Sequence, residues 1–363
     1  MGNFGLDIPW TLIEPDDPSG SDMVDVSGVK RKWLDVAYAA QSPSQKLDIY
    51  LPEEGDGPFP TYIFIHGGAF IAGDKQDVQF LLAADGINRG YAVASVEYRK
   101  GFESKAPNAL YDVKAAIRFL KAHAADYRLD PARFAVGGDS AGAYYAVFAA
   151  ATAGIPVFDG PDPVWPEASG EVKAVVAQCG CYDLLRMAPP PEVEAAAPKE
   201  FVPGTIPAFD GPAPVFPSAS GEVKAVVAQC GCYDLLRMAP PPEVEAAAPK
   251  EFVPGTIPAN LMSIFIGANP RLFPDLAAWL NPLTYITKDF PPTLVQVGRE
   301  DTVVPCSESV QLAAVIVEKC GRERVRFDAH DGWNHCALNH IVTADWFMKA
   351  NLDRVFAFLD EVL

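Results

Sequence analysis

The chain of 363 residues is long enough to bury a sizeable core, either as two ordinary domains or as one large α/β unit. Its 29 Lys and Arg residues against 47 Asp and Glu residues give a formal net charge of −18 at pH 7. Nucleic acid and anionic membrane surfaces are therefore disfavoured as partners, because both would repel the chain.

The first residues, MGNFGLDIPWTLIEPDD, have no basic stretch followed by an apolar one, so they lack the pattern of a signal peptide. Leu6 also breaks the N-myristoylation pattern, which has Ser or Thr at that position. The longest mostly apolar run, 141–155, is too short to cross a membrane. The sequence thus predicts a soluble, cytoplasmic protein.

The run Tyr-Ile-Phe-Ile at 62–65 is short and apolar, as buried strands are. It leads directly into a loop of small residues, His-Gly-Gly-Ala-Phe at 66–70. Small residues let backbone N–H groups approach a negatively charged oxygen, so Gly67, Gly68 and Ala69 are candidates for an oxyanion hole. His66 is expected to hold this loop rather than to transfer protons.

A second strand is predicted over 92–96, and apolar residues at 110, 113, 117 and 120 predict a helix after it. A third strand, 133–137, precedes Gly-Asp-Ser-Ala-Gly at 138–142, and an Ala-rich helix is predicted over 143–153. G-x-S-x-G between a strand and a helix is the nucleophile elbow, whose glycines let the chain turn sharply enough to present a hydroxyl. Ser140 is the candidate nucleophile, and Ala141 is a candidate oxyanion donor.

One segment of the chain is present twice. Residues 172–208 and 223–259 are identical, and the wider units 158–208 and 209–259 have 51 residues each. The units differ at Asp162/Ala213, Trp165/Phe216 and Glu167/Ser218, with Val157/Ala208 at the edge. Solenoid units normally occur in three or more diverged copies, so this pattern favours one duplication, natural or engineered.

The seven cysteines are an odd number, and four of them come from a C-G-C that lies within the repeat. We expect reduced, mostly buried thiols in a chain of this size without an export signal. C-x-C spacing is weak evidence for a metal, because alternate residues of a strand share a face. The cysteines are Cys179, Cys181, Cys230, Cys232, Cys306, Cys320 and Cys336.

A strand is predicted over 293–297, and an acidic turn, 298–305, follows it. Asp301 in this turn is the candidate acid, because a carboxylate there could hold an imidazole in its productive tautomer. Glu300 is the nearest rival, and an ordinary acidic turn is the simpler alternative.

Near the end of the chain we predict a helix over 307–321, a strand over 325–327 and a last helix from about Thr343. His335 lies in a Gly-containing loop after that strand, where the order Ser, acid, His places a base. His330 and His340 are the alternatives, and His123 is expected to be a surface residue.

Short apolar strands that alternate with helical patterns predict a mostly parallel sheet with helices on both faces. Several stretches also match a known family in order and spacing: HGGAF, AGDK, VEYRKGFESKAPNALYDVKAAIRFL, GDSAG, NPLTYITKDFPPTLVQVGREDTVVP and GWNH. With these motifs the chain resembles the α/β-hydrolase esterases and lipases, near the carboxylesterases that include acetyl-xylan and feruloyl esterases. The resemblance covers about Lys46 to the C-terminus, and only the duplicated unit has no counterpart.

The resemblance implies hydrolysis of a carboxylic ester through an acyl-enzyme, without a metal or organic cofactor. Its nucleophile, acid and base fall on Ser140, Asp301 and His335. Its oxyanion loop falls on Gly67, Gly68 and Ala69, with Ala141 as the donor at the elbow. Many members have a third glycine in place of Ala69, so the acyl pocket is expected to be slightly tighter here. Phe70, Asp139 and Trp333 are candidates for substrate binding, although Phe70 and Trp333 are equally plausible as core.

The family order requires one strand from the repeat beside the nucleophile strand, within a single domain over 1–363. Both copies side by side would move Asp301 and His335 outward by one strand spacing, about 4.8 Å, which is too far for a triad. We therefore expect one copy, preferably the first, in the sheet. The other would lie outside it as an insertion, a cap or a strand exchanged with a second subunit.

The leading hypothesis is a serine esterase for small or medium esters, such as short-chain acyl esters, acetylated sugars or phenolic esters. Two alternatives stay open: a related serine peptidase, and a hydrolase-like binding or scaffold protein that the duplication has inactivated. The expected partner is a small-molecule ester, and a homo-oligomer formed through the duplicated segment is a further hypothesis.

Overall fold

The structure is a computed structural model in which residues 10, 12–13, 22–187, 261–301, 303–338, 341–342 and 344–363 are described. The second copy of the repeat, 209–259, lies outside the described residues, and so does the alternative base His340.

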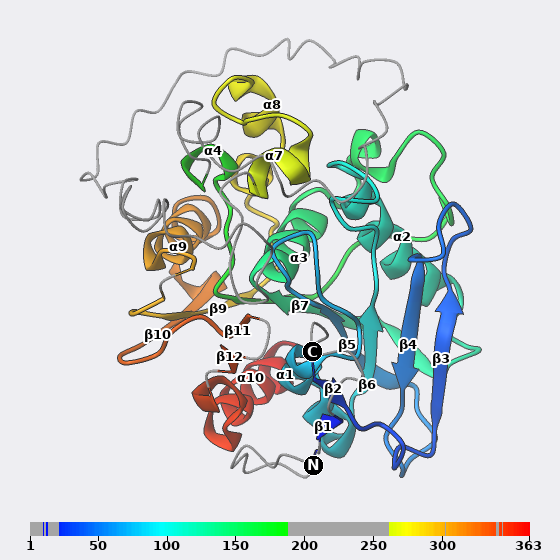
Figure 1. The fold of residues 1–363 in the computed structure, drawn as a ribbon. Helices are drawn as coiled ribbons and strands as arrows, with labels where there is room; N and C mark the ends of the chain where they lie inside the picture. Colours follow the sequence, from blue (N-terminus) through cyan, green and yellow to red (C-terminus); the bar gives the residue numbers. More distant parts are fainter. Residues whose placement is uncertain are drawn as a thin grey trace.

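The fold is organised around an eight-stranded sheet with the order β10-β9-β8-β7-β5-β6-β4-β3 (Figure 1). Neighbouring strands are parallel except at one edge, where β4 runs antiparallel to both β6 and β3. The predicted mostly parallel sheet is therefore confirmed. Its strands are β3 (Lys32–Ala37), β4 (Lys46–Tyr50), β5 (Phe59–Ile65), β6 (Ala92–Val96), β7 (Leu129–Asp139), β8 (Ala174–Gln178), β9 (Thr293–Gly298) and β10 (Val325–His330).

Helices cover both faces of the sheet, as predicted (Figure 1). One apolar cluster joins the sheet to α2 (Asn108–Ala122), α3 (Ala141–Ala151), α4 (Leu184–Met187), α7 (Leu261–Ile266), α8 (Pro274–Trp279) and α9 (Cys306–Cys320). A second cluster, on the opposite face, joins it to α1 (Leu81–Ala84) and α10 (Lys349–Val362). None of the described helices is long and apolar enough to cross a membrane.

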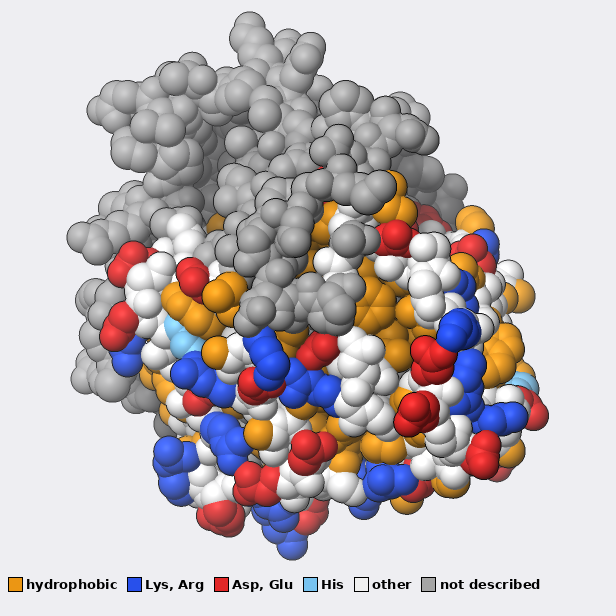
Figure 2. All heavy atoms as spheres, turned by 90° about the horizontal axis from the view of Figure 1, so that it is seen from below, with side chains coloured by type: hydrophobic (Ala, Val, Ile, Leu, Met, Phe, Trp, Pro, Cys, Tyr) orange, Lys and Arg blue, Asp and Glu red, His pale blue; other side chains and the backbone are white. Residues whose placement is uncertain are grey.

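The remaining elements are short. Two hairpins pair β1 (Leu12–Ile13) with β2 (Met23–Val24) and β11 (Ala337–Leu338) with β12 (Ile341–Val342). The short 3-10 helices are Val78–Phe80, Asp85–Arg89, Pro156–Asp159, Pro282–Tyr285, Arg322–Arg324 and Ala344–Phe347. On the face seen in Figure 2, basic and acidic side chains are interspersed rather than gathered by sign.

Three predicted boundaries were wrong. Strand β7 is longer than predicted, and α3 begins directly after Ser140 rather than at residue 143. The predicted C-terminal helix is divided, because Met348 has an extended backbone (φ −65°, ψ 142°) between a 3-10 turn and α10.

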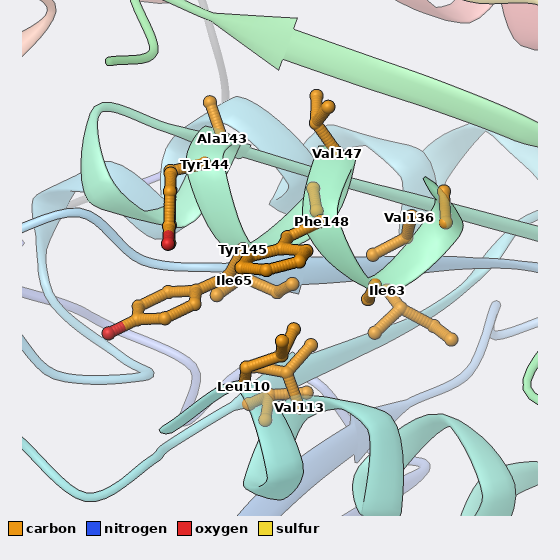
Figure 3. Packing of buried hydrophobic residues seen from close by; sticks show 14 of the residues in the cluster. Ile63, Ile65, Leu110, Val113, Val136, Ala143, Tyr144, Tyr145, Val147 and Phe148 are labelled. Atoms are coloured by element: carbon orange, nitrogen blue, oxygen red, sulfur yellow. The ribbon is translucent and has the colours of Figure 1, made fainter. Parts of the chain in front are cut away.

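Helix α3 is packed on every side, and this packing fixes the elbow in front of it. Residues 141–150 are all buried, as expected for a helix that is apolar all round. Figure 3 shows side chains of α3 above those of β5 and α2, with Phe148 near Ile65 and Leu110 below. The N-terminus of α3 is therefore held firmly at the carboxyl end of β7.

Strand β8 comes from the first copy of the repeat and lies between β7 and β9. Val175 is fully buried and pairs with Val136 on one side and Thr293 on the other. Ahead of this strand, Trp165 donates its indole N–H to the carbonyl oxygen of Tyr38 at 2.9 Å and packs edge-on against Phe119. The first copy is thus joined to both the sheet and α2.

Because β8 comes from the first copy of the repeat, the same substitution in the two copies should change the stability of the protein by different amounts. Val175→Ala removes buried methyl groups from the middle of the sheet, so we expect a loss of about 2 kcal/mol in the free energy of unfolding. Val226→Ala, at the repeated position, is the matched control and should cost clearly less. Denaturant unfolding measures both, and equal losses would contradict the assignment of the strand to the first copy.

Candidate active site

The nucleophile elbow is built by two glycines that pack against the end of β5. A Cβ atom on Gly138 or on Gly142 would collide with the carbonyl oxygen of Ile65. Ser140 between them has φ 52° and ψ −119°, a conformation that costs a non-glycine residue about 1–3 kcal/mol. Its N–H donates to the carbonyl oxygen of Gln178 at 2.9 Å, which fixes the turn against β8.

Asp301 and His335 form a buried hydrogen-bonded pair. The Oδ2 atom of Asp301 lies 2.8 Å from Nδ1 of His335, and the two side chains are 0% and 4% exposed. The other oxygen of Asp301 accepts the N–H groups of Val303 and Val304, both at 2.8 Å. The carboxylate is therefore held through both of its oxygens, and it orients the imidazole through Nδ1.

The rival acid and the rival base lie elsewhere. Glu300 is exposed at the surface of the turn. His330 stacks on Trp333 with ring centroids 3.9 Å apart, and its Nδ1 faces the guanidinium of Arg354 at 3.2 Å. The structure thus brings together the preferred candidates, Asp301 and His335, rather than these alternatives.

One strand, β8, separates the strand of Ser140 from the strand that precedes Asp301. Ser140 follows β7, while Asp301 follows β9 and His335 follows β10. Among the described residues, no hydrogen bond joins the side chains of Ser140 and His335. Catalytic hydrogen bonds are often long in the absence of substrate and tighten when it binds.

The loop after β5 has two kinds of N–H group. The N–H of Gly67 is already bound inside the protein, by Oε1 of Gln79 at 2.5 Å and by Oδ1 of Asp139 at 3.1 Å. In the described part of the chain, the N–H groups of Gly68 and Ala69 donate no such hydrogen bond. Ala141 is the first residue of α3, where a helix leaves its N–H without an intrahelical acceptor. Gly68, Ala69 and Ala141 are therefore better candidates for oxyanion donors than Gly67, whose N–H holds the loop.

His66 holds the same loop from behind. Its Nδ1 lies 2.7 Å from the carbonyl oxygen of Gly67, and its Nε2 lies 3.2 Å from Oε1 of Glu97. Acceptor oxygens beside both ring nitrogens favour the protonated ring. Burial acts to lower the pKa of His66, but the Glu97 carboxylate outweighs it and raises the pKa. The ring also stacks on Tyr98 with centroids 4.4 Å apart, which fits the expectation that His66 is a loop anchor.

The three candidates for substrate binding occupy different surroundings. Phe70 is 1% exposed and stacks on Phe265 at 4.0 Å, a position that favours core packing over direct substrate contact. Asp139 is fully buried. Burial is the main cause that raises its pKa well above the ordinary value, and the charge of the Cys179 thiolate is the second. Trp333 is partly buried and has one face covered by the His330 ring.

Sequence reasoning missed Cys179 as a neighbour of the acid and base. Ligand atoms of Cys179, Asp301 and His335 all lie within 4.8 Å of one another. Burial acts to raise the pKa of the Cys179 thiol, but a hydrogen bond with Cys336 and the charge of His335 lower it below the usual value. The signal in the sequence was its position: the residue after β8 lies beside Ser140, the residue after β7.

Solved structures with a similar fold support this description. A truncated carbohydrate esterase from gut microbiota superimposes with a TM-score of 0.64 at 23% identity, covering 92% of this chain and 96% of that one. A thermophilic esterase of Thermogutta terrifontis, with butyrate bound, gives 0.60 at 17% identity, covering 92% and 95%. The strand order, the elbow and these similarities define an α/β-hydrolase fold.

The BD-FAE family model matches residues 47–208 and 205–316, so the chain belongs to the BD-FAE family. The two matched stretches meet where the two copies of the repeat meet. Among curated relatives, a probable carboxylic ester hydrolase of Mycobacterium tuberculosis is 32% identical over 42% of this chain and 35% of its own length. A probable isoprenylcysteine alpha-carbonyl methylesterase of Arabidopsis thaliana is 33% identical over 42% and 31%. The chain thus spans about a third of the length of these relatives.

The surroundings of His335 predict an unusual titration. Burial acts to lower its pKa, but Cys179 and Asp301 outweigh it and raise the pKa well above the ordinary value of about 6.5. The protonated imidazole should therefore persist to higher pH than in an exposed histidine. NMR titration of the ring signals measures this, and Cys179→Ser should move the His335 midpoint to lower pH. A His335 midpoint at or below 6.5 would contradict this reasoning.

Proposed function

We propose that this chain is a serine carboxylic-ester hydrolase with Ser140 as nucleophile, His335 as base and Asp301 as the acid that orients it. The observation that carries the proposal is the buried Asp301–His335 hydrogen bond, 2.8 Å long, at the same carboxyl edge of the sheet as the strained elbow of Ser140. A positioned base held by a third group, with a nucleophile nearby, is the arrangement of nucleophilic catalysis.

The proposed reaction has two halves. The Ser140 hydroxyl oxygen bonds to the ester carbonyl carbon while Nε2 of His335 takes its proton, and the N–H groups of Gly68, Ala69 and Ala141 bind the oxyanion. The leaving alcohol then takes that proton as its bond to the carbonyl carbon breaks. In the second half, water gives a proton to His335 and attacks the acyl-enzyme, and the acid is released as Ser140 regains its proton.

Small or medium esters are the proposed substrates: short-chain acyl esters, acetylated sugars or phenolic esters. Support comes from the printed descriptions of similar proteins, which include a carboxylic ester hydrolase, a methylesterase and a carbohydrate esterase. The strongly acidic chain favours an uncharged or cationic substrate over an anionic one. A homo-oligomer formed through the duplicated segment stays a separate proposal.

Replacing the nucleophile gives the first functional test. Ser140→Ala should lower kcat for p-nitrophenyl acetate by about 10⁴-fold or more and abolish labelling by a fluorophosphonate probe, because no hydroxyl remains for acylation. Ser169→Ala, which changes an exposed serine, is the control and should keep both. Hydrolysis by Ser140→Ala at the wild-type rate would overturn the proposal. A wild-type chain that neither labels nor hydrolyses would favour the inactive alternative.

A matched pair of neighbouring acids tests the role of Asp301. Asp301→Asn should lower kcat by about 10³–10⁴-fold, because the amide no longer holds Nδ1–H of His335 in the productive tautomer. Glu300→Gln, one residue away and exposed, should change kcat by less than about twofold. Steady-state kinetics on the same ester compare the two. Equal losses in the two variants would be incompatible with the assigned roles.

A further inference from the structure

The side chain of Gln79 reaches the loop after β5 from a separate element. Its Oε1 atom accepts the N–H of Gly67 at 2.5 Å, and the same N–H makes a longer hydrogen bond, 3.1 Å, to Oδ1 of Asp139. Gln79 is 4% exposed and lies in the 3-10 helix Val78–Phe80. Two acceptors from two different elements therefore converge on one N–H group of the loop.

Gln79 is held in place independently of the loop. The side chain of Asp77 caps the 3-10 helix by accepting the backbone N–H of Gln79 at 2.9 Å. The next residue, Phe80, is fully buried, and its ring lies against those of Tyr50 and Phe64 with centroids 5.1 and 6.4 Å apart. Phe64 belongs to β5, the strand from which the loop starts, so Gln79 and the loop are fixed to the same strand. Gln79 can therefore act as an anchor for the loop rather than adapt to it.

The loop needs an anchor because its backbone is strained. Gly68, Ala69 and Phe70 all have positive φ, at 106°, 54° and 66°. Ala69 and Phe70 are not glycines, and such residues keep this conformation only where the surrounding structure enforces it. At the far end of the strained stretch, the carbonyl oxygen of Phe70 accepts the N–H of Gly101 at 2.8 Å. Gly67 is the matching fixed point at the near end.

The space around Gly67 leaves little room for another arrangement. A Cβ atom there would lie 3.0 Å from the backbone oxygen and from Oδ2 of Asp139, and 3.1 Å from Oε1 of Gln79. An amide oxygen suits this place, because it accepts a hydrogen bond without putting a formal negative charge beside an oxyanion. Without that oxygen, Gly67 would keep only the longer of its two hydrogen bonds, and the strain in the loop would favour rotation of the following N–H groups.

We propose that Gln79 is a positioning residue for ester hydrolysis, because its hydrogen bond to Gly67 keeps the next two N–H groups of the loop aimed at the oxyanion. The inference rests on the proposed function, in which the N–H groups of Gly68 and Ala69 bind that oxyanion. These hydrogen bonds are stronger in the transition state than with the bound ester. Loss of the anchor should therefore lower kcat and leave KM nearly unchanged.

A matched pair of glutamines tests this role in the full chain. Gln79→Met removes the acceptor and nearly keeps the volume of the side chain. Gln76→Met makes the same change three residues earlier, where the side-chain amide donates to the carbonyl oxygen of Val24 instead, and it is the control. Titration with a fluorophosphonate probe, carried to completion, first counts the competent sites in each variant. Steady-state kinetics with p-nitrophenyl acetate then give KM, and kcat per competent site.

We expect kcat per competent site to fall about 10–100-fold in Gln79→Met, with KM within about threefold of the wild-type value. Gln76→Met should stay within about twofold of the wild type in both constants. Gln79→Asn keeps an amide but is one methylene shorter, so its oxygen should not reach Gly67 and the same loss is expected. It takes the place of Gln79→Met if circular dichroism shows that Gln79→Met does not fold.

The outcomes separate this inference from the proposed function. A wild-type chain that neither hydrolyses the ester nor reacts with the probe would refute the proposed function itself. With an active wild type, an unchanged kcat in folded Gln79→Met would overturn only the role of Gln79. An equal loss in Gln76→Met, or a higher KM with kcat unchanged in Gln79→Met, would do the same. Failure of both Gln79 variants to fold would make Gln79 a structural residue and would also overturn the inference.

Discussion

The site depends on a row of backbone hydrogen bonds that joins the ends of four parallel strands. The N–H of Ser140 binds the carbonyl oxygen of Gln178, and the N–H of Cys179 binds that of Gln296, at 2.9 and 2.8 Å. On the far side, the N–H of Arg299 binds the carbonyl oxygen of His330 at 2.9 Å. Neighbouring strands lie about 4.8 Å apart, so the distance from Ser140 to Asp301 is set by how many strands stand between them. In the described sheet one strand, β8, stands between them. The side chains have little freedom to compensate for a second intervening strand.

The parts of the site that could be predicted from the sequence are those with a local signal. Ser140 lies in a motif that only a sharp strand-to-helix turn explains, and Asp301 and His335 follow predicted strands in a known order. The internal hydrogen bonds of Gly67 could not be predicted, because Gln79 and Asp139 reach it from other elements. Cys179 was missed for the same reason. The C-x-C pattern indicates only that two residues share a face of a strand, and the nearness of Cys179 to His335 depends on which strands lie beside β8.

The buried titratable groups around the loop after β5 would favour a negative oxygen bound there. Glu97 raises the pKa of His66 behind the loop, which favours the protonated ring, and Glu97 itself binds the ring nitrogen away from Gly67. Asp139, next to Ser140, would repel an oxyanion if it were ionised. Burial raises its pKa well above the ordinary value, so this carboxyl group is more easily protonated than an exposed aspartate. Its Oδ1 atom meanwhile accepts the N–H of Gly67.

The indole of Trp165 helps to explain which of the two identical segments occupies the sheet. The strand sequences cannot decide, because 172–208 and 223–259 offer the same side chains to β7 and β9. The indole N–H of Trp165 donates a hydrogen bond to the carbonyl oxygen of Tyr38, and the residue that repeats it is Phe216, whose side chain has no N–H group. One hydrogen bond contributes about 1 kcal/mol, which is about a fivefold bias between alternatives. The first copy is therefore favoured in the sheet by a hydrogen bond of Trp165, a residue that lies outside the strand that the two copies share.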